Sequence, residues 1–257
     1  MLNDAKTLAG YTLQSHDGEI GKVKEFYFDD QHWAVRYLVA DTGNWLSGRQ
    51  VLISPYALSG VDKDEKRIVV DLTSAQIENS PSLDTDKPVS KQFEEQYYKF
   101  YGWPMYWGGS YMWGLSPLIA RNGYTPRASN TGGKPWSPTL RSTHDVSGYN
   151  IKASDGEVGH VDDFVIDDEN WAIRYLVIDT RNWWPGKSVL ISPRWIDRVD
   201  WEEAKVHVNL TRDSIKKSPE YTQQSLPTRD YETSLHGHYN QRGYWVEESA
   251  VKESSNR

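Results

Sequence analysis

The sequence predicts a mainly β protein: two small β-barrels in tandem, each followed by short helices, joined by an aromatic and Gly/Pro-rich linker. Gly10–Pro81 superposes on Gly148–Pro219 without a gap, and 35 of the 72 aligned positions are identical. Within each copy, short runs of alternating apolar residues are separated by polar turns, which is typical of strands. A gapless repeat of this length indicates one folding unit written twice.

The strands of the first copy follow from its turns. Asp17-Gly18 is a strong tight-turn signal, and the polar run 29–32 predicts a second turn. The strand after that turn has apolar residues on both faces, so we expect it to be covered on both sides. Expected elements are strands at 11–15, 20–28, 33–40, 51–53 and 67–70 and a helical turn at 55–58, all repeated at the aligned positions of the second copy.

Two helices are expected after each barrel. Thr73 and Thr211 are suitable N-caps for a short helix that ends near a Ser-Pro pair. A second helix in each copy has apolar residues every four positions, with Ser90 and Thr228 as its N-caps. We therefore divide the chain into barrel 1 (1–85), an aromatic helical extension and linker (86–140), barrel 2 (141–222) and a helical extension with a polar tail (223–257).

Charge and composition limit the partners that we expect. The net charge is −7, with −5 in residues 1–88, −5 in residues 141–257 and +3 between them. Acidic barrels lack the positive face that phosphate binding needs, so we do not expect nucleic acid as their partner. There is no cysteine and no run near the roughly 20 apolar residues of a spanning helix, so we expect a cytoplasmic protein with at most peripheral contact with the inner membrane.

The combined motifs resemble a known family. The first copy contains DGEIGKV, FDD, WAVRYLVADTG and GRQVLISP between Asp17 and Pro55, and the second copy repeats them with class-preserving changes. This combination resembles the PRC-barrel domain of the photosynthetic reaction-centre H subunit and of a ribosome-maturation factor. The segment EEQYYKFYGWPMYW is similar to the extension after the barrel in bacterial H-subunit-like proteins.

The resemblance implies a function only by analogy. We expect a non-catalytic binding or scaffold protein whose duplicated barrels mediate protein–protein contacts, with barrel–barrel packing within the chain or between chains. One alternative is a peripheral, H-subunit-like component of a membrane electron-transfer complex related to photosynthesis. The other is an RNA or ribosome-assembly adaptor. The chain has neither the membrane helix of an H subunit nor a separate RNA-processing domain.

The paired carboxylates are the strongest candidates for acid–base or metal chemistry. They lie in predicted turns, where aspartate commonly bonds to the backbone, and this structural role is the interpretation we favour. The mid-strand arginines could bind an anion, although a salt bridge to a nearby aspartate is the simpler role. The candidate charge network comprises Asp29, Asp30, Arg36, Asp41, Asp167, Asp168, Arg174 and Asp179.

No pattern predicts an enzyme, a cofactor or a metal site. The sequence has no Gly-rich phosphate loop, no serine nucleophile elbow and no zinc-binding helix motif. His236 and His238 form the one close histidine pair, and on a helix they would point to different faces.

Aromatic residues are the remaining candidates for a binding surface. The segment 97–113 concentrates tryptophan and tyrosine beside basic charges, and the loops of the second copy are more aromatic than those of the first. Stacking on single-stranded nucleic acid and insertion at a membrane interface are conceivable, but we favour packing between the barrels or against a partner. The candidate interaction surface comprises Trp103, Tyr106, Trp107, Tyr111, Trp113, Trp184, Trp195 and Trp201.

Overall fold

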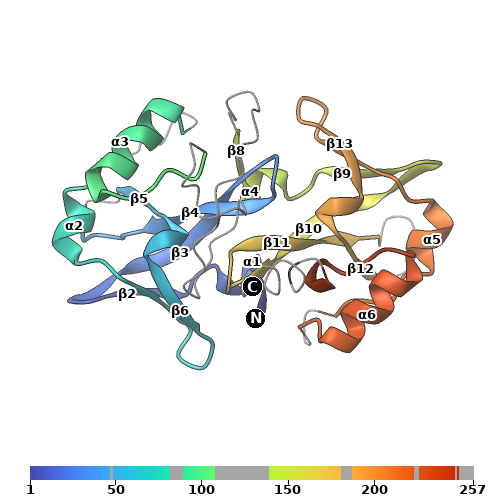
Figure 1. Ribbon diagram of the computed structural model, residues 1–257, viewed down its shortest axis with the longest axis horizontal. Coiled ribbons are helices and arrows are strands. Elements are labelled where there is room, and N and C mark those ends of the chain that lie inside the picture. Colours follow the sequence, from blue (N-terminus) through green and yellow to red (C-terminus); the bar gives the residue numbers. More distant parts are fainter. Residues whose placement is uncertain are drawn as a thin grey trace, which may run out of the picture. The chain divides into compact units, whose positions relative to one another are not determined.

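The protein folds into two β-rich units, each built around a seven-stranded sheet (Figure 1). The computed structural model describes residues 1–46, 49–81, 89–107, 139–180, 187–222, 226–246 and 248. Unit 1 takes its described residues from 1, 5–144 and 167–172, and unit 2 from 2–4, 145–166 and 173 onward. The mainly β fold predicted from the sequence is confirmed.

The sheet of unit 1 has the strand order β6-β7-β2-β3-β4-β5, with β8 paired to the far part of β3. The strand pairings of the described residues do not close this sheet. The strands are β2 (Thr12–Ser15), β3 (Gly18–Asp29), β4 (Ala34–Asp41), β5 (Gln50–Ile53), β6 (Leu58–Asp62), β7 (Arg67–Val70) and β8 (Leu140–Ser142). The helices are α1 (Ala5–Leu8), η1 (Pro55–Ala57), α2 (Ser74–Glu78) and α3 (Lys91–Tyr101).

The sheet of unit 2 repeats this order as β13-β14-β9-β10-β11-β12, with β1 paired to β10. This sheet is also open within the described residues. Its strands are β1 (Leu2–Asp4), β9 (Asn150–Ala153), β10 (Gly156–Asp167), β11 (Ala172–Asp179), β12 (Ser188–Ile191), β13 (Ile196–Asp200) and β14 (Lys205–Val208). The helices are α4 (Thr143–Val146), at whose middle the chain passes from unit 1 to unit 2, η3 (Pro193–Trp195), α5 (Arg212–Lys216) and α6 (Arg229–His238).

One glycine in the long strand of each unit is required by close packing. A Cβ on Gly21 would lie 2.2 Å from the carbonyl oxygen of Asp41, and Gly21 has a φ of +133°. A Cβ on the equivalent Gly159 would lie 2.1 Å from the carbonyl oxygen of Asp179. Both contacts are far below van der Waals separation, so only glycine fits where the long strand crosses the end of its neighbour.

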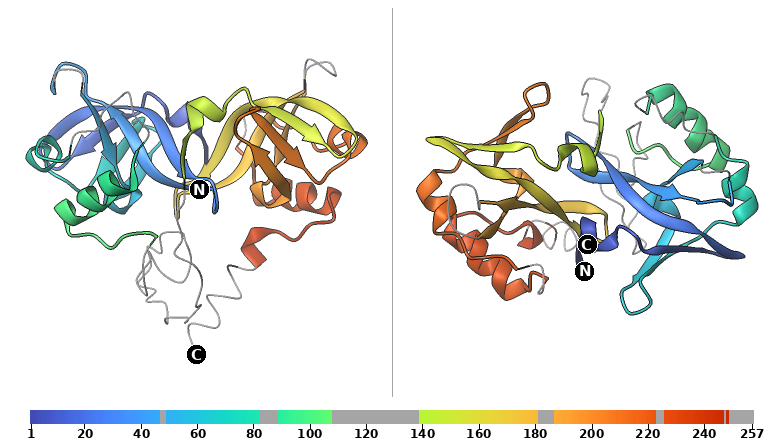
Figure 2. Two further views of the ribbon diagram at one scale, coloured as in Figure 1. Left: turned by 90° about the horizontal axis from the view of Figure 1, so that it is seen from above. Right: turned by 180° about the vertical axis from the view of Figure 1, so that it is seen from behind.

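The helices begin where the sequence predicts. The Thr73 side chain accepts from the amide of Gln76, whose own side chain accepts from the Thr73 amide, which makes a capping box for α2. Ser90 and Thr228 are the N-caps of α3 and α6. Each second helix then packs on its own sheet, and α3 covers β4 and β5 (Figure 2).

Candidate functional site

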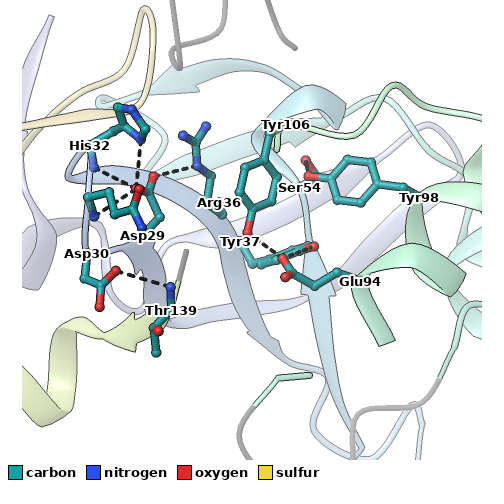
Figure 3. Close-up of polar contacts among 11 residues, drawn as sticks. Asp29, Asp30, His32, Arg36, Tyr37, Ser54, Glu94, Tyr98, Tyr106 and Thr139 are labelled. Atoms are coloured by element: carbon teal, nitrogen blue, oxygen red, sulfur yellow. Dashed lines mark hydrogen bonds and ion pairs between the residues drawn. The ribbon is translucent and has the colours of Figure 1, made fainter. Parts of the chain in front are cut away.

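A buried aspartate–arginine pair lies at the end of β3 in unit 1 (Figure 3). The Arg36 Nε donates to Asp29 Oδ2 at 2.8 Å, and both side chains are fully buried. The backbone amides of Gln31 and His32 donate to Asp29 Oδ1 at 3.1 and 2.7 Å. Burial opposes ionisation of Asp29, but the His32 hydrogen bonds and the Arg36 charge outweigh it and hold the pKa below its usual value.

Beside this pair, a buried glutamate from α3 is held by two tyrosines (Figure 3). Tyr37 Oη and Tyr106 Oη donate to Glu94 Oε1 at 3.0 and 2.6 Å. Burial raises the pKa of Glu94 to about 7, although the two tyrosine hydrogen bonds and the Arg36 charge act in the opposite direction. The Arg36 guanidinium lies 4.3 Å from the Tyr106 ring centroid, so it contacts the same cluster.

Unit 2 contains the equivalent cluster at the aligned positions of the second copy. Tyr175 Oη and Tyr244 Oη each donate to Glu232 Oε1 at 2.9 Å, and burial raises the pKa of Glu232. The Arg174 guanidinium lies 3.8 Å from the Tyr244 ring centroid. No sequence pattern singled out Glu94 or Glu232, although all three members of each cluster are identical between the copies.

The units differ in the residue beside the cluster. In unit 2, His236 Nε2 lies 3.0 Å from Tyr175 Oη, and its Nδ1 lies 3.0 Å from the carbonyl oxygen of Arg242. Burial lowers the pKa of His236. The equivalent residue of unit 1 is Tyr98, whose hydroxyl lies 3.3 Å from Ser54 Oγ.

The other members of the candidate charge network lie in further contacts, and Asp167 and Asp168 both pair with the N-terminal ammonium of Met1. Asp30 accepts from the Thr139 amide and lies 3.4 Å from Arg141 Nη2, and Asp41 accepts from the Gly43 amide. Arg174 pairs with Glu248 at 2.7 Å, and Asp167 accepts from the Glu169 amide at 3.2 Å. Asp179 is buried, and the Asp168 amide donates to the Met1 carbonyl. The eight residues are therefore spread over several local contacts, with Asp29 and Arg36 joined directly as an ion pair.

Burial removes several tryptophans and tyrosines from the candidate interaction surface. Tyr106, Trp107 and Trp195 are buried inside their units, because they pack against α3 or α6 and the adjoining sheet. Trp103 and Trp201 are partly exposed. Tyr111, Trp113 and Trp184 lie outside the described residues.

Trp103 belongs to a partly exposed group of rings on unit 1 that the sequence patterns did not assemble. The Trp103 ring stacks on Tyr101 with centroids 4.3 Å apart, and it lies 5.4 Å from the ring of Tyr56. Phe100 contacts Tyr101 at 4.9 Å. Tyr56 and Phe100 are each 45% exposed. We call Tyr56, Phe100, Tyr101 and Trp103 the aromatic face.

The C-terminal cap of α3 positions the rings of the aromatic face. Gly102 ends α3 in the left-handed conformation, with a φ of 68°, which glycine adopts without strain. The chain then turns back, and the Trp103 amide donates to the carbonyl oxygen of Tyr98 at 3.0 Å. This turn lays the Trp103 ring over Tyr101 and beside Tyr56 of η1. A YxFYGW segment followed across the helix end is the signal that could have located the group.

The described part of the chain holds neither a metal cluster nor a spanning helix. Among these residues, no three His, Asp or Glu side chains are grouped so that they could hold a metal ion. Within the same ranges, no helix has both the length and the apolar character needed to cross a bilayer.

The two units share one fold, one buried cluster and one pattern of turns, which defines a tandem β module. The PRC-barrel domain model matches residues 4–77 and 138–215, which together are more than half of the chain. The chain therefore belongs to the PRC-barrel family and carries two copies of the domain in tandem. A comparison with curated proteins found no match.

Proposed function

We propose that this chain is a non-catalytic binding or scaffold protein that recognises a protein partner through the aromatic face of unit 1. The observation that carries the proposal is this partly exposed group of four rings beside the end of α3, in which Tyr56 and Phe100 are exposed and Tyr101 and Trp103 are partly buried. Stacked aromatic side chains supply a large contact area with little loss of conformational entropy, and they are common anchors of protein interfaces.

Comparison of the two copies supports this assignment. The positions equivalent to Tyr56, Phe100 and Trp103 are Arg194, His238 and Gln241, all exposed. The fold therefore accepts polar residues at each position and does not need aromatic ones. A feature that one unit carries and the shared fold does not require is better explained by binding than by stability.

The clusters of ionisable groups favour binding over catalysis. Glu94 has a pKa near neutrality, but it is only 4% exposed and both tyrosine donors are buried with it. A general acid or base must come within hydrogen-bond reach of its substrate. A closed cluster repeated in both units is consistent with a structural role.

The family resemblance supplies two rival partners. An H-subunit-like component of a membrane electron-transfer complex would co-fractionate with membranes, and the aromatic face would suit a membrane interface. An RNA or ribosome-assembly adaptor would sediment with ribosomal subunits. We favour a protein partner in the cytoplasm because the acidic charge of both repeats opposes binding to phosphate-rich surfaces.

Affinity capture with mass spectrometry tests the proposal. Wild-type protein is compared with Tyr56→Arg/Trp103→Gln, which carries the residues of unit 2, and with Trp45→Arg, a change at an exposed tryptophan outside the aromatic face. We expect a specific protein that the wild type and Trp45→Arg retain and that the double variant loses. Equal recovery by all three, or recovery only of membrane or ribosomal material, would contradict the proposal.

A further inference from the structure

The two repeats exchange one strand. When the second copy is aligned on the first, Leu2–Asp4 falls on Leu140–Ser142, so β1 and β8 are equivalent segments at the start of each copy. However, β8 pairs with β3 in unit 1, and β1 pairs with β10 in unit 2. Each unit therefore takes its seventh strand from the other repeat.

Side chains of β8 and of the residue that follows it form hydrogen bonds and an ion pair with residues of unit 1. In the antiparallel register, Ser142 is the partner of Tyr27 and Arg141 the partner of Phe28. Ser142 Oγ donates to the Glu25 carboxylate, and the Phe26 amide donates to Thr143 Oγ1 at 3.2 Å. The Arg141 guanidinium pairs with Asp30 at 3.4 Å.

β1 is held in unit 2 by a contact of its own. Asp4 is buried there and accepts from Tyr221 Oη at 2.6 Å. Asp163, the β10 residue aligned with Glu25, is also buried, and burial together with the Asp4 and Asp163 carboxylates raises the pKa of Tyr221. Each exchanged strand is therefore bonded by a side chain to the unit that receives it.

We propose that a second copy of this chain can complete both units by the same exchange in trans. The first half (residues 1–107) of one copy would combine with the second half (residues 139–257) of the other, and the reverse pairing would close a two-fold dimer. The strand pairings of β1 with β10 and of β8 with β3 each join the two halves, and residues 108–138 connect the halves in the sequence, so the same pairings serve in the dimer.

Closure and concentration decide the outcome. A two-fold pair places all four exchanged strands, so no strand is left to add a third chain. Within one chain, the connection keeps the halves at an effective concentration on the order of millimolar. The monomer is therefore favoured in dilute solution, and the exchanged dimer forms when the chain folds at a comparable concentration.

A refolding series on the full-length wild type tests the proposal. The chain is unfolded in denaturant and refolded at about 1 µM and at about 1 mM, so that the series reaches the effective concentration from far below it. Light scattering should give the 29.6 kDa of the chain at the lower concentration and a substantial fraction of twice this mass at the higher. A monomer at both concentrations would overturn the proposal.

A disulfide identifies the exchanged contact, because the chain has no cysteine of its own. In Tyr27→Cys/Ser142→Cys, the oxidised dimer should run as a covalent dimer and the oxidised monomer as a single chain. The control is Asp62→Cys/Arg67→Cys, a pair within one hairpin, which should stay intrachain in both forms. A dimer whose 27–142 bond is intrachain would rule out exchange. If this variant does not refold, the wild-type series alone decides.

Discussion

Unit 1 and unit 2 carry the same buried Tyr–Glu–Tyr cluster and differ in the residues around it. In unit 1, Arg36 beside the cluster forms a fully buried ion pair with Asp29, and the aromatic face lies at the end of α3. In unit 2 the arginine pairs with Glu248, which is one-third exposed, a histidine joins the cluster, and the positions of three of the four rings are polar. The shared part therefore maintains the fold, and the differing part is where function is to be sought.

The largest difference between the units is expected on removal of the arginine. Arg36→Met should lower the free energy of unfolding of unit 1 by about 3–5 kcal/mol, because it leaves the Asp29 carboxylate buried without its cation. Arg174→Met should cost about 2 kcal/mol in unit 2, because Glu248 can return to water. Amide hydrogen exchange in increasing urea measures each unit separately. Equal losses in both units would show that the two arginines contribute alike to stability.

The second difference is in pH dependence. The pKa of Glu94 is about 7 in the folded protein and 4.5 ordinarily, so folding favours the protonated carboxyl group. Its contribution, about 3 kcal/mol, is fully present below pH 4.5 and is lost as the pH rises to 7. The groups that face it are Tyr37, Tyr106, Arg36 and Lys91. Glu94→Gln should flatten this fall in unit 1.

Unit 2 should respond less steeply to pH. The raised pKa of Glu232 acts in the same direction as that of Glu94, but the lowered pKa of His236 acts in the opposite direction. Unit 2 loses the His236 contribution as the pH falls below 6.5, so the two effects oppose one another. Tyr175, Tyr244, Arg174, Arg194 and Arg229 face this pair. Unit-resolved exchange between about pH 4 and pH 8 checks both profiles, and parallel profiles would contradict this difference.

The third and smallest difference concerns core packing. Trp195 and His236 have ring centroids 5.1 Å apart in unit 2, and the equivalent residues of unit 1 are Ala57 and Tyr98. His236→Tyr alone should overpack the core, and Trp195→Ala alone should leave a cavity. The free energy of unfolding of the double variant should fall by about 1–2 kcal/mol less than the sum of the two single losses. Additive losses in urea unfolding would show that the two positions are independent.

The sequence was sufficient for features encoded locally or by the repeat. The mainly β fold, the paired copies and the N-caps Thr73, Ser90 and Thr228 were predicted because each depends on a short pattern or on the duplication. Glu94 is bonded to Tyr37, which lies 57 positions earlier in the sequence, and to Tyr106, which lies 12 positions later. No local pattern therefore reveals this cluster. The strand exchange was missed because β1 and β8 are three residues long and have no periodicity to read.

We expect unit 1, and not unit 2, to present the binding surface. Amide hydrogen exchange of the full chain, with and without the partner recovered by capture, tests it most directly. We predict protection of residues 54–58 and 98–105, which carry the aromatic face, and no change at the equivalent residues 192–196 and 236–243. Protection of the unit 2 segments, or of both sets alike, would contradict it.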